Sequence, residues 1–137
     1  MDTFAVLKIS ASALDAQKKR MNVIASNMAN VHSTRTEEGG PYRRKDVVFS
    51  SILMEQNHAP LEGVRIVDIA TDNSPMKTVF DPGHPDADKD GFVTMPNVNV
   101  IEEMVNMMMA LRAYEASVSV FNISKTMFMK TLEIGRQ

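Results

Sequence analysis

Two segments with helical spacing, one near each end of the 137-residue chain, constrain its fold more than any other feature. In the first segment, apolar residues alternate three and four positions apart, and only Lys18 interrupts the pattern. Such heptad spacing is typical of a helix that lays a narrow apolar stripe against a partner helix. We call this stripe the N-terminal seam, and it comprises Phe4, Leu7, Ala11, Leu14, Lys18, Met21, Ala25 and Met28.

The second segment repeats the pattern over a longer span, and Lys125 alone interrupts it. Asn97 or Asn99 is suited to cap its start, because short polar side chains accept hydrogen bonds from the first free backbone amides. Glu102 and Glu103 would then lie near the positive end of the helix dipole. We call this stripe the C-terminal seam, and it comprises Val100, Met104, Met107, Leu111, Tyr114, Val118, Phe121, Lys125, Phe128 and Leu132.

The region between the two seams is rich in Gly, Pro, Asp and short β-prone runs, with candidate strands at residues 42–49, 63–69 and 76–80. The sequence therefore predicts a mainly α fold. Long N- and C-terminal helices pair as a coiled-coil layer, and a small β-rich insertion lies between them. The expected parts are an N-terminal helix of a helical core at 1–32, the β-rich or loop insertion at 33–97, and a C-terminal helix of the core at 98–137.

Helix length argues for an assembly protein. Helices of about 30 and 37 residues would be longer than a small domain is wide. The middle region has too few apolar residues to cover both seams, and helices gain most of their stability from packing. We therefore expect other chains to supply part of the packing. The apolar seam residues other than alanine are our predicted subunit-packing positions.

Two features of the seams leave alternatives open. Lys18 and Lys125 can each extend to water, or they can fix the register of a helix bundle, as single polar seam residues do. The chain has 12 methionines, and four of them are bunched within residues 104–109. They suit either flexible filling of a core or a helix surface that must fit several non-identical neighbours.

Composition excludes several functional classes. A net charge of −2 does not favour nucleic-acid binding, and the absence of cysteine excludes thiolate metal sites and a cysteine nucleophile. The sequence contains no phosphate-binding glycine loop and no hydrolase or dinucleotide motif. No apolar run approaches the roughly 18 residues that span a bilayer. The first residues also lack the pattern of a signal peptide. We expect no enzyme activity, no cofactor and no small-molecule substrate.

The sharpest local motif is an acidic run that matches the first half of a calcium-binding EF-hand loop. Asp86, Asp88 and Asp90 occupy its first three ligand positions, and Gly91 follows them. The second half fails, because Asn97 stands where a bidentate Glu is needed. We therefore predict a solvated acidic turn, with no metal site, and keep a weak calcium-binding module as the alternative.

Four segments, which follow one another in the order that a known family has them, carry a resemblance that covers nearly the whole chain. The first runs from Ala25 to Thr36 and contains an Asn-x-x-Asn turn, Asn27 to Asn30. It is similar to the N-terminal signature of flagellar rod and hook proteins. Three later segments, at 38–45, 81–91 and 95–107, resemble specifically the proximal rod proteins of that family. The residues that we assign to the family motif are Asn27, Asn30, Gly39, Gly40, Pro41 and Tyr42.

The resemblance implies a structural subunit of the bacterial flagellar basal body, within the rod that crosses the periplasm. Such subunits transmit torque from the membrane ring towards the distal rod and hook. The implied partners are other rod proteins, the ring-to-rod adaptor, further copies of the chain and the flagellar type III export apparatus. Export would proceed without a cleaved signal peptide. A peripheral membrane or secretion adaptor is the remaining alternative, but the chain lacks the basic amphipathic face that it would need.

Overall fold

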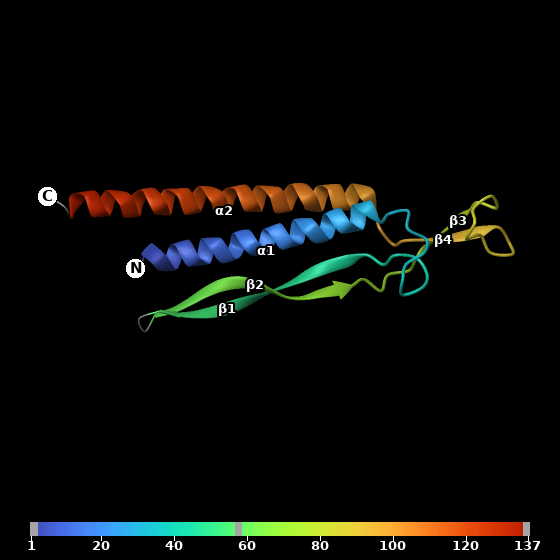
Figure 1. Cartoon of the computed structure of the whole chain (residues 1–137), viewed down its shortest axis with the longest axis horizontal. Coiled ribbons are helices and arrows are strands. Elements are labelled where there is room, and N and C mark those ends of the chain that lie inside the picture. The colour runs from blue at the N-terminus through green and yellow to red at the C-terminus, as the bar shows by residue number, and fades with distance from the viewer. Residues whose placement is uncertain (1–2, 57–58, 136–137) are drawn as a thin grey trace.

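The computed structural model describes residues 3–56 and 59–135, without the side chains of 54–61. The fold is elongated and has three layers along most of its length: helix α2, helix α1 and a long β-hairpin (Figure 1). The elements are α1 at Thr3–Ala29, β1 at Lys45–Gln56, β2 at Ala59–Thr71, β3 at Lys77–Phe80, β4 at Phe92–Met95 and α2 at Val100–Ile134. The predicted fold class is thus confirmed.

The two helices are antiparallel, because α2 begins beside the end of α1 and returns along it (Figure 1). At the far end of the pair, the rings of Phe4 and Phe128 meet edge to face at 5.1 Å between centroids. Helix α1 is the middle layer, since it packs against α2 on one side and against both β1 and β2 on the other. Of the described elements, α2 contacts α1 alone. Most of its surface therefore stays open to solvent.

Small residues predominate among the buried positions of the two helices. In α1, Ala5 and Ala16 are buried, together with the larger Ile24. In α2, Ala110 and Ser124 are buried. Small side chains let two helix backbones approach closely, so few large apolar residues are needed inside this pair. The larger apolar side chains of α2 are left on its outer flanks.

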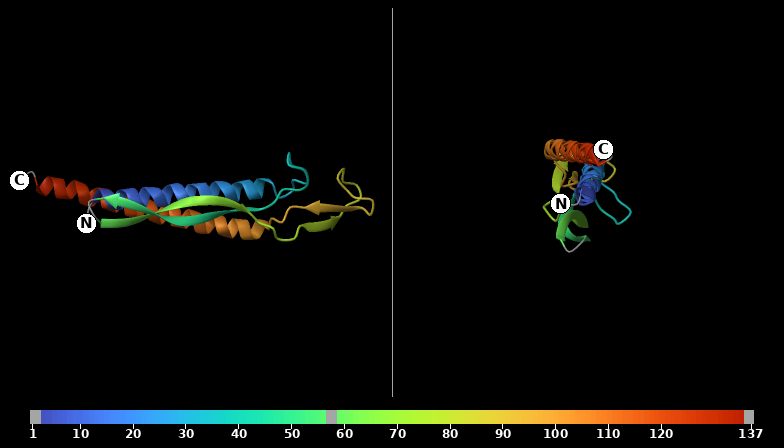
Figure 2. Two further views of the ribbon diagram at one scale, coloured as in Figure 1. Left: turned by 90° about the horizontal axis from the view of Figure 1, so that it is seen from below. Right: turned by 90° about the vertical axis from the view of Figure 1, so that its left-hand side faces the viewer.

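The insertion forms two antiparallel hairpins (Figure 2). The long β1–β2 hairpin pairs Lys45 with Thr71 at its open end and has a bulge between Val48 and Phe49. Its strands overlap the candidate strands at 42–49 and 63–69, but β1 begins three residues later than its candidate, and both strands extend further towards the turn. The hairpin lies back along α1. A two-stranded ribbon is marginal by itself, so its packing against α1 is what stabilises it.

The short β3–β4 hairpin lies beyond the helix ends and includes a strand, β4, that the sequence pattern did not indicate. Phe80 and Phe92 pair across it, with ring centroids 5.3 Å apart. Four residues are too few to give a clear alternation of apolar and polar side chains, which is why β4 was missed.

Candidate functional site

A buried polar junction joins the end of α1, the start of α2 and the segment that leads into β1. At its centre, the side chain of Asn27 is 0 % exposed. Its amide nitrogen donates to the Lys45 carbonyl at 2.8 Å and to Glu103 Oε2 at 3.0 Å. Its oxygen accepts from the Tyr42 hydroxyl at 3.0 Å and from the Lys45 backbone amide at 2.9 Å. All four hydrogen bonds of a buried amide are therefore satisfied.

Glu103 is the charged member of the junction and is also 0 % exposed. Its second oxygen, Oε1, accepts from Arg44 Nε at 2.7 Å. Burial opposes the charge on Arg44, but the hydrogen bond to Glu103 and the negative charges of Glu103 and Asp46 together outweigh that effect and raise the pKa of the guanidinium. The buried carboxylate is thus paired with a permanent cation, which is the condition for burying a charge at tolerable cost.

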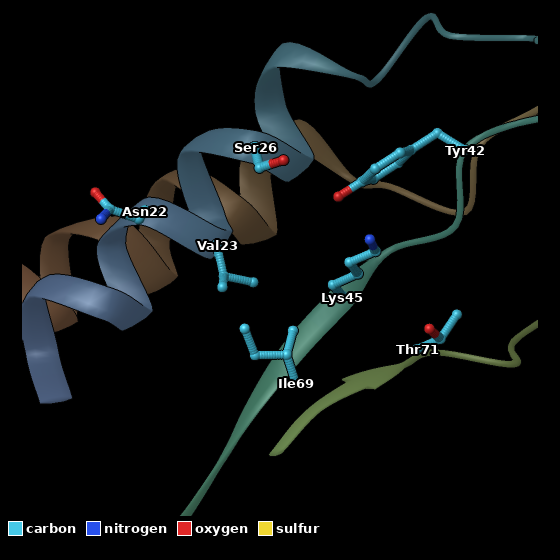
Figure 3. A pocket seen from close by; sticks show the side chains of 7 residues that line it. All are labelled: Asn22, Val23, Ser26, Tyr42, Lys45, Ile69 and Thr71. Carbon is cyan, nitrogen blue, oxygen red and sulfur yellow. The ribbon is translucent and has the colours of Figure 1, made fainter. Parts of the chain in front are cut away.

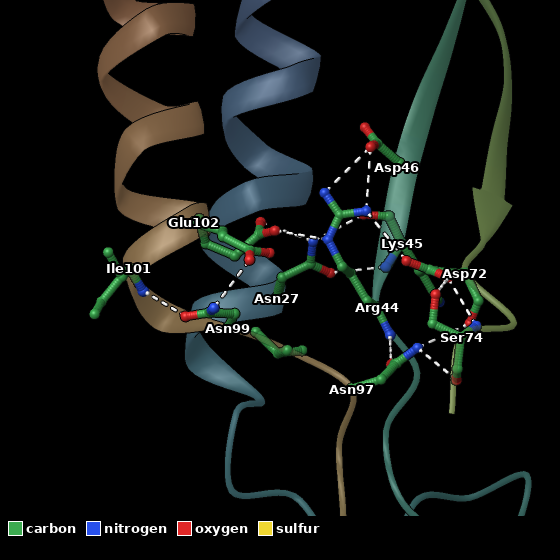
Figure 4. A network of polar contacts seen from close by, with 12 residues as sticks. Asn27, Arg44, Lys45, Asp46, Asp72, Ser74, Asn97, Asn99, Ile101 and Glu102 are labelled. Atoms are coloured by element: carbon green, nitrogen blue, oxygen red, sulfur yellow. Dashed lines mark hydrogen bonds and ion pairs between the residues drawn. The ribbon is translucent and has the colours of Figure 1, made fainter. Parts of the chain in front are cut away.

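Asn97 connects the junction to the segment that follows β2. Its side-chain oxygen accepts from the Arg44 backbone amide at 2.8 Å, and its amide nitrogen donates to the carbonyls of Asp72 and Ser74 (Figure 4). Asn99, two residues later, is the N-cap of α2 and accepts from the amide of Ile101. Of the two predicted caps, Asn99 therefore caps the helix, and Asn97 connects the open end of the long hairpin to the helix pair.

Sequence reasoning found part of this junction. Asn27 and Tyr42 belong to the predicted family motif, whereas Glu103 was expected beside the helix dipole. The basic run at residues 43–45, which contains Arg44 and is followed by Asp46, is typical of a solvated or salt-bridged surface patch. Arg44 does carry the salt bridges expected of that patch, to Asp46 and Asp72, while its link to Glu103 was missed. No sequence signal indicated this link, because the burial of Ala110, seven residues after Glu103 at the same heptad position, is seen only in the structure.

The remaining motif residues shape the loop that follows α1. The side chain of Asn30 donates to the carbonyl of Ser26 and accepts from the hydroxyl of Ser33. Gly39 and Gly40 both adopt positive φ, of 87° and 76°, a conformation that glycine tolerates best. Pro41 follows them, and the backbone amide of Tyr42 then bonds to the carbonyl of Ser33. The loop thus returns the chain to the junction with the Tyr42 side chain pointing at α1.

Beside the junction, a shallow hollow separates α1 from the open end of the long hairpin. Figure 3 shows Tyr42 and Lys45 on one wall and side chains of α1 on the other. The lining carries no carboxylate, no histidine and no cluster of charges that would recognise a ligand. It consists of Asn22, Val23, Ser26, Tyr42, Lys45, Ile69 and Thr71.

The acidic run is an exposed turn between β3 and β4. Asp88 accepts from the backbone amides of Asp90 and Phe92, so it organises the turn itself. Asp86 bonds instead to Thr34 and Arg35 in the loop after α1. The hydrogen bond from Thr34, together with the charge of Arg35, lowers the pKa of Asp86. Within residues 3–56 and 59–135, no group of three or more acidic or histidine side chains is arranged to hold a metal ion.

The predicted subunit-packing residues fall into two sets in the single chain. The first set is half-buried and comprises Leu7, Leu14, Met21, Met28, Met107, Tyr114, Val118, Phe121 and Phe128. The second set is exposed and comprises Phe4, Val100, Met104, Leu111 and Leu132. Their role between subunits stays a prediction. Lys18 and Lys125 are exposed, as expected of side chains that extend to water.

The buried face of α2 is displaced from the C-terminal seam, because its buried residues each lie one position before a seam residue. Glu103, Ala110 and Ser124 are buried, whereas Met104 and Leu111, the next residues along, are 53 % and 45 % exposed. Further large apolar residues are exposed on the same helix, among them Ile101, Met108, Met109, Ile123, Met127 and Ile134. A helix that is apolar on nearly every side is typical of one surrounded by other protein. Across the part of the chain that the structure describes, neither helix is long and apolar enough to cross a membrane.

The fold and its junction define a class: an elongated structural protein whose paired terminal helices form the body and whose insertion is fixed to one end of it. Family models agree. Residues 7–35 match the model described as "Flagella basal body rod protein", and residues 89–134 match "Flagellar basal body rod FlgEFG protein C-terminal".

Curated relatives identify the branch of that family. The chain is 46% identical to the flagellar basal-body rod protein FlgC of Yersinia enterocolitica, with 99% of this chain and 100% of the relative covered. It is 43% identical to FlgC of Bacillus subtilis, with coverage of 99% and 100%, and 41% identical to FlgC of Borreliella burgdorferi, with coverage of 98% of each. The chain belongs to the FlgC family of flagellar basal-body rod proteins. It is a structural rod protein that assembles with other rod components in the basal body.

Proposed function

We propose that this chain is a non-enzymatic subunit of the proximal rod, where it transmits torque from the membrane ring towards the distal rod and hook. One observation carries the proposal. Helix α2 contacts only α1 among the described elements, yet it exposes large apolar side chains along its whole length, from Ile101 to Ile134. This surface requires neighbouring protein, because each buried side chain of this kind contributes about 1.5–3 kcal/mol.

Neighbouring subunits would supply that protein. Further copies of the chain, other rod proteins and the ring-to-rod adaptor are the proposed partners. The exposed methionines of α2, such as Met104, Met108 and Met127, favour this arrangement, since methionine adapts to neighbours of different shape. A load applied to such an assembly is carried by many apolar contacts in parallel, and no catalytic group is needed.

The route to the rod is also a proposal. The chain would pass through the flagellar type III export apparatus without a cleaved signal peptide and assemble in the periplasm. The apolar flanks of α2 are open in the single chain, and neighbouring subunits would cover them when the chain assembles.

Cryo-electron tomography of basal bodies tests the proposal. A strain that lacks this gene should keep the membrane ring and lose both rod and hook, and complementation should restore them. As a matched pair, Phe121→Asp on the C-terminal seam should fail to complement, whereas Lys89→Asp in the exposed turn should complement fully. Normal rods in the deletion strain, or motility with Phe121→Asp, would contradict it.

A further inference from the structure

The apolar repeats of the two helices do not by themselves select one alignment. On α1, Leu7, Leu14, Met21 and Met28 recur every seven residues. On α2, Met107, Tyr114, Phe121 and Phe128 recur at the same interval. Sliding one helix along the other by one heptad, about 10 Å, would place apolar residues against apolar residues again.

Helix lengths do not prevent such a slip either. Helix α2 has 35 residues and α1 has 27, a difference of eight, so α2 is longer by more than one heptad. The seam lysines are exposed rather than inserted between the helices, so they do not oppose it. Another interaction must therefore favour the observed helix alignment over alignments that are shifted by one heptad.

The polar junction does not repeat. At the heptad positions equivalent to Glu103, α2 carries Ala110, Ser117, Ser124 and Thr131, none of which is a carboxylate. A shift of seven residues would take the Asn27 amide away from its acceptor on Glu103 and leave the buried carboxylate without Asn27. Unpaired buried polar groups are costly, and a single polar pair inside an apolar interface is known to fix register in helix pairs.

We infer that the network of Asn27, Arg44 and Glu103 sets the register of the two terminal helices, while the apolar contacts supply attraction without choosing the alignment. The network also contains Tyr42 and the backbone of Lys45. The register is therefore fixed jointly with the position of the β insertion along the helix pair. This inference does not depend on the proposed rod position or partners.

A spin-label distance measurement on the full chain tests the register directly. The chain has no cysteine, so nitroxides can be attached at Asn22→Cys on α1 and Thr126→Cys on α2, both exposed positions. Counting from the contact of Asn27 with Glu103, the two sites are offset by 18 residues, about 27 Å along the axis. A slip of one heptad changes this offset by about 10 Å. The native network should give one narrow distance.

Two further versions of the labelled chain discriminate register from stability. In the first, Asn27→Leu, Tyr42→Phe, Arg44→Met and Glu103→Leu replace the network by apolar side chains. We expect retained helicity by circular dichroism, with two or more distances separated by about 10 Å. In the second, Glu103→Ala with Ala110→Glu moves the carboxylate by one heptad. We expect the main distance to shorten by about 10 Å, as α1 follows its partner.

Each other outcome overturns the inference. A broad distribution with the native network would show that the network does not fix the alignment. A single native distance in the apolar version would show that apolar packing selects the register. Loss of helicity there would show that apolar contacts do not hold the helices together. An unshifted distance after the carboxylate is moved would assign the register to the connecting loops.

Discussion

The amide nitrogen of Asn27 lies 3.0 Å from a carboxylate oxygen of Glu103, and neither side chain is exposed to solvent. The two residues are 76 positions apart in the chain and belong to different helices. Their contact therefore closes a loop that contains the whole insertion. Removing either partner leaves the other as a buried polar group without its hydrogen bond. Because this lowers stability, single substitutions at the junction should have measurable effects.

Replacing Glu103 should destabilise the fold strongly. Glu103→Ala leaves Arg44 and Asn27 without their shared acceptor, and we expect a loss of about 2–4 kcal/mol in the free energy of unfolding. Urea unfolding followed by circular dichroism measures it. Glu115→Ala, an exposed carboxylate on the same helix, is the matched control and should change stability by less than about 0.5 kcal/mol. Equal effects of the two changes would contradict the junction's importance.

An isosteric change at Asn27 should introduce a pH dependence. Asn27→Asp replaces the donor that faces Glu103 with a second carboxylate, and repulsion raises the folded-state pKa of the introduced carboxyl group above its unfolded value. Stability that depends on such raised pKa values is present at low pH and lost as pH rises. The deficit relative to the native chain should thus be larger at pH 7 than near pH 4–5. Parallel urea titrations of both chains measure this difference, and a deficit independent of pH would refute the prediction.

The acidic turn should show the opposite pH dependence of stability. The hydrogen bond from Thr34 is the main reason that the pKa of Asp86 is lowered, and the charge of Arg35 adds to it. Stability from this contact should be present above the ordinary pKa of an aspartate and lost as pH falls through the lowered value. Thr34→Val should raise the pKa of Asp86, as measured by the carboxyl chemical shift in an NMR titration. Asp90, which bonds to neither residue, is the internal control.

Gly91 should be intolerant of a side chain. Its φ is +82°, and a Cβ there would come within 2.9 Å of the Phe80 ring and 3.2 Å of Pro82. Gly91→Ala should destabilise the β3–β4 hairpin by about 1–2 kcal/mol. Amide hydrogen exchange at residues 77–80 and 92–95 measures the local effect. Gly83→Ala is the control, since its nearest contact would be an ordinary 3.6 Å, and similar protection in both variants would contradict the prediction.

Exposed apolar residues of α2 should separate assembly from folding. Met104→Asp places a charge on a side chain that is 53 % exposed in the single chain, so helix content should hardly change. Subunit packing at this position predicts that the variant fails to form rods, as seen by electron microscopy of isolated basal bodies. Asn122→Asp, also exposed on α2, is the control and should assemble. Normal rods with Met104→Asp would show that Met104 does not belong to the subunit-packing surface.

The sequence pattern predicts the helices well because heptad spacing is a local signal that extends over many residues. The side of α2 that faces α1 was less accessible. Apolar side chains occupy most positions of this helix, so spacing alone does not indicate that Ala110 and Ser124, rather than Met104 and Leu111, are buried. The Glu103–Arg44 contact was missed for another reason, since it joins residues 59 positions apart and no local pattern encodes it.

The helix pair is held against sliding at one end. The polar junction joins α1 to α2 there, through Asn27 and Glu103, and the rings of Phe4 and Phe128 meet near the other end. Two slender beams that slide freely along each other bend separately, whereas two beams that are prevented from sliding bend as one thicker beam. Resistance to shear between α1 and α2 should therefore make the pair stiffer than the sum of its helices, which is the mechanical property that a shaft needs.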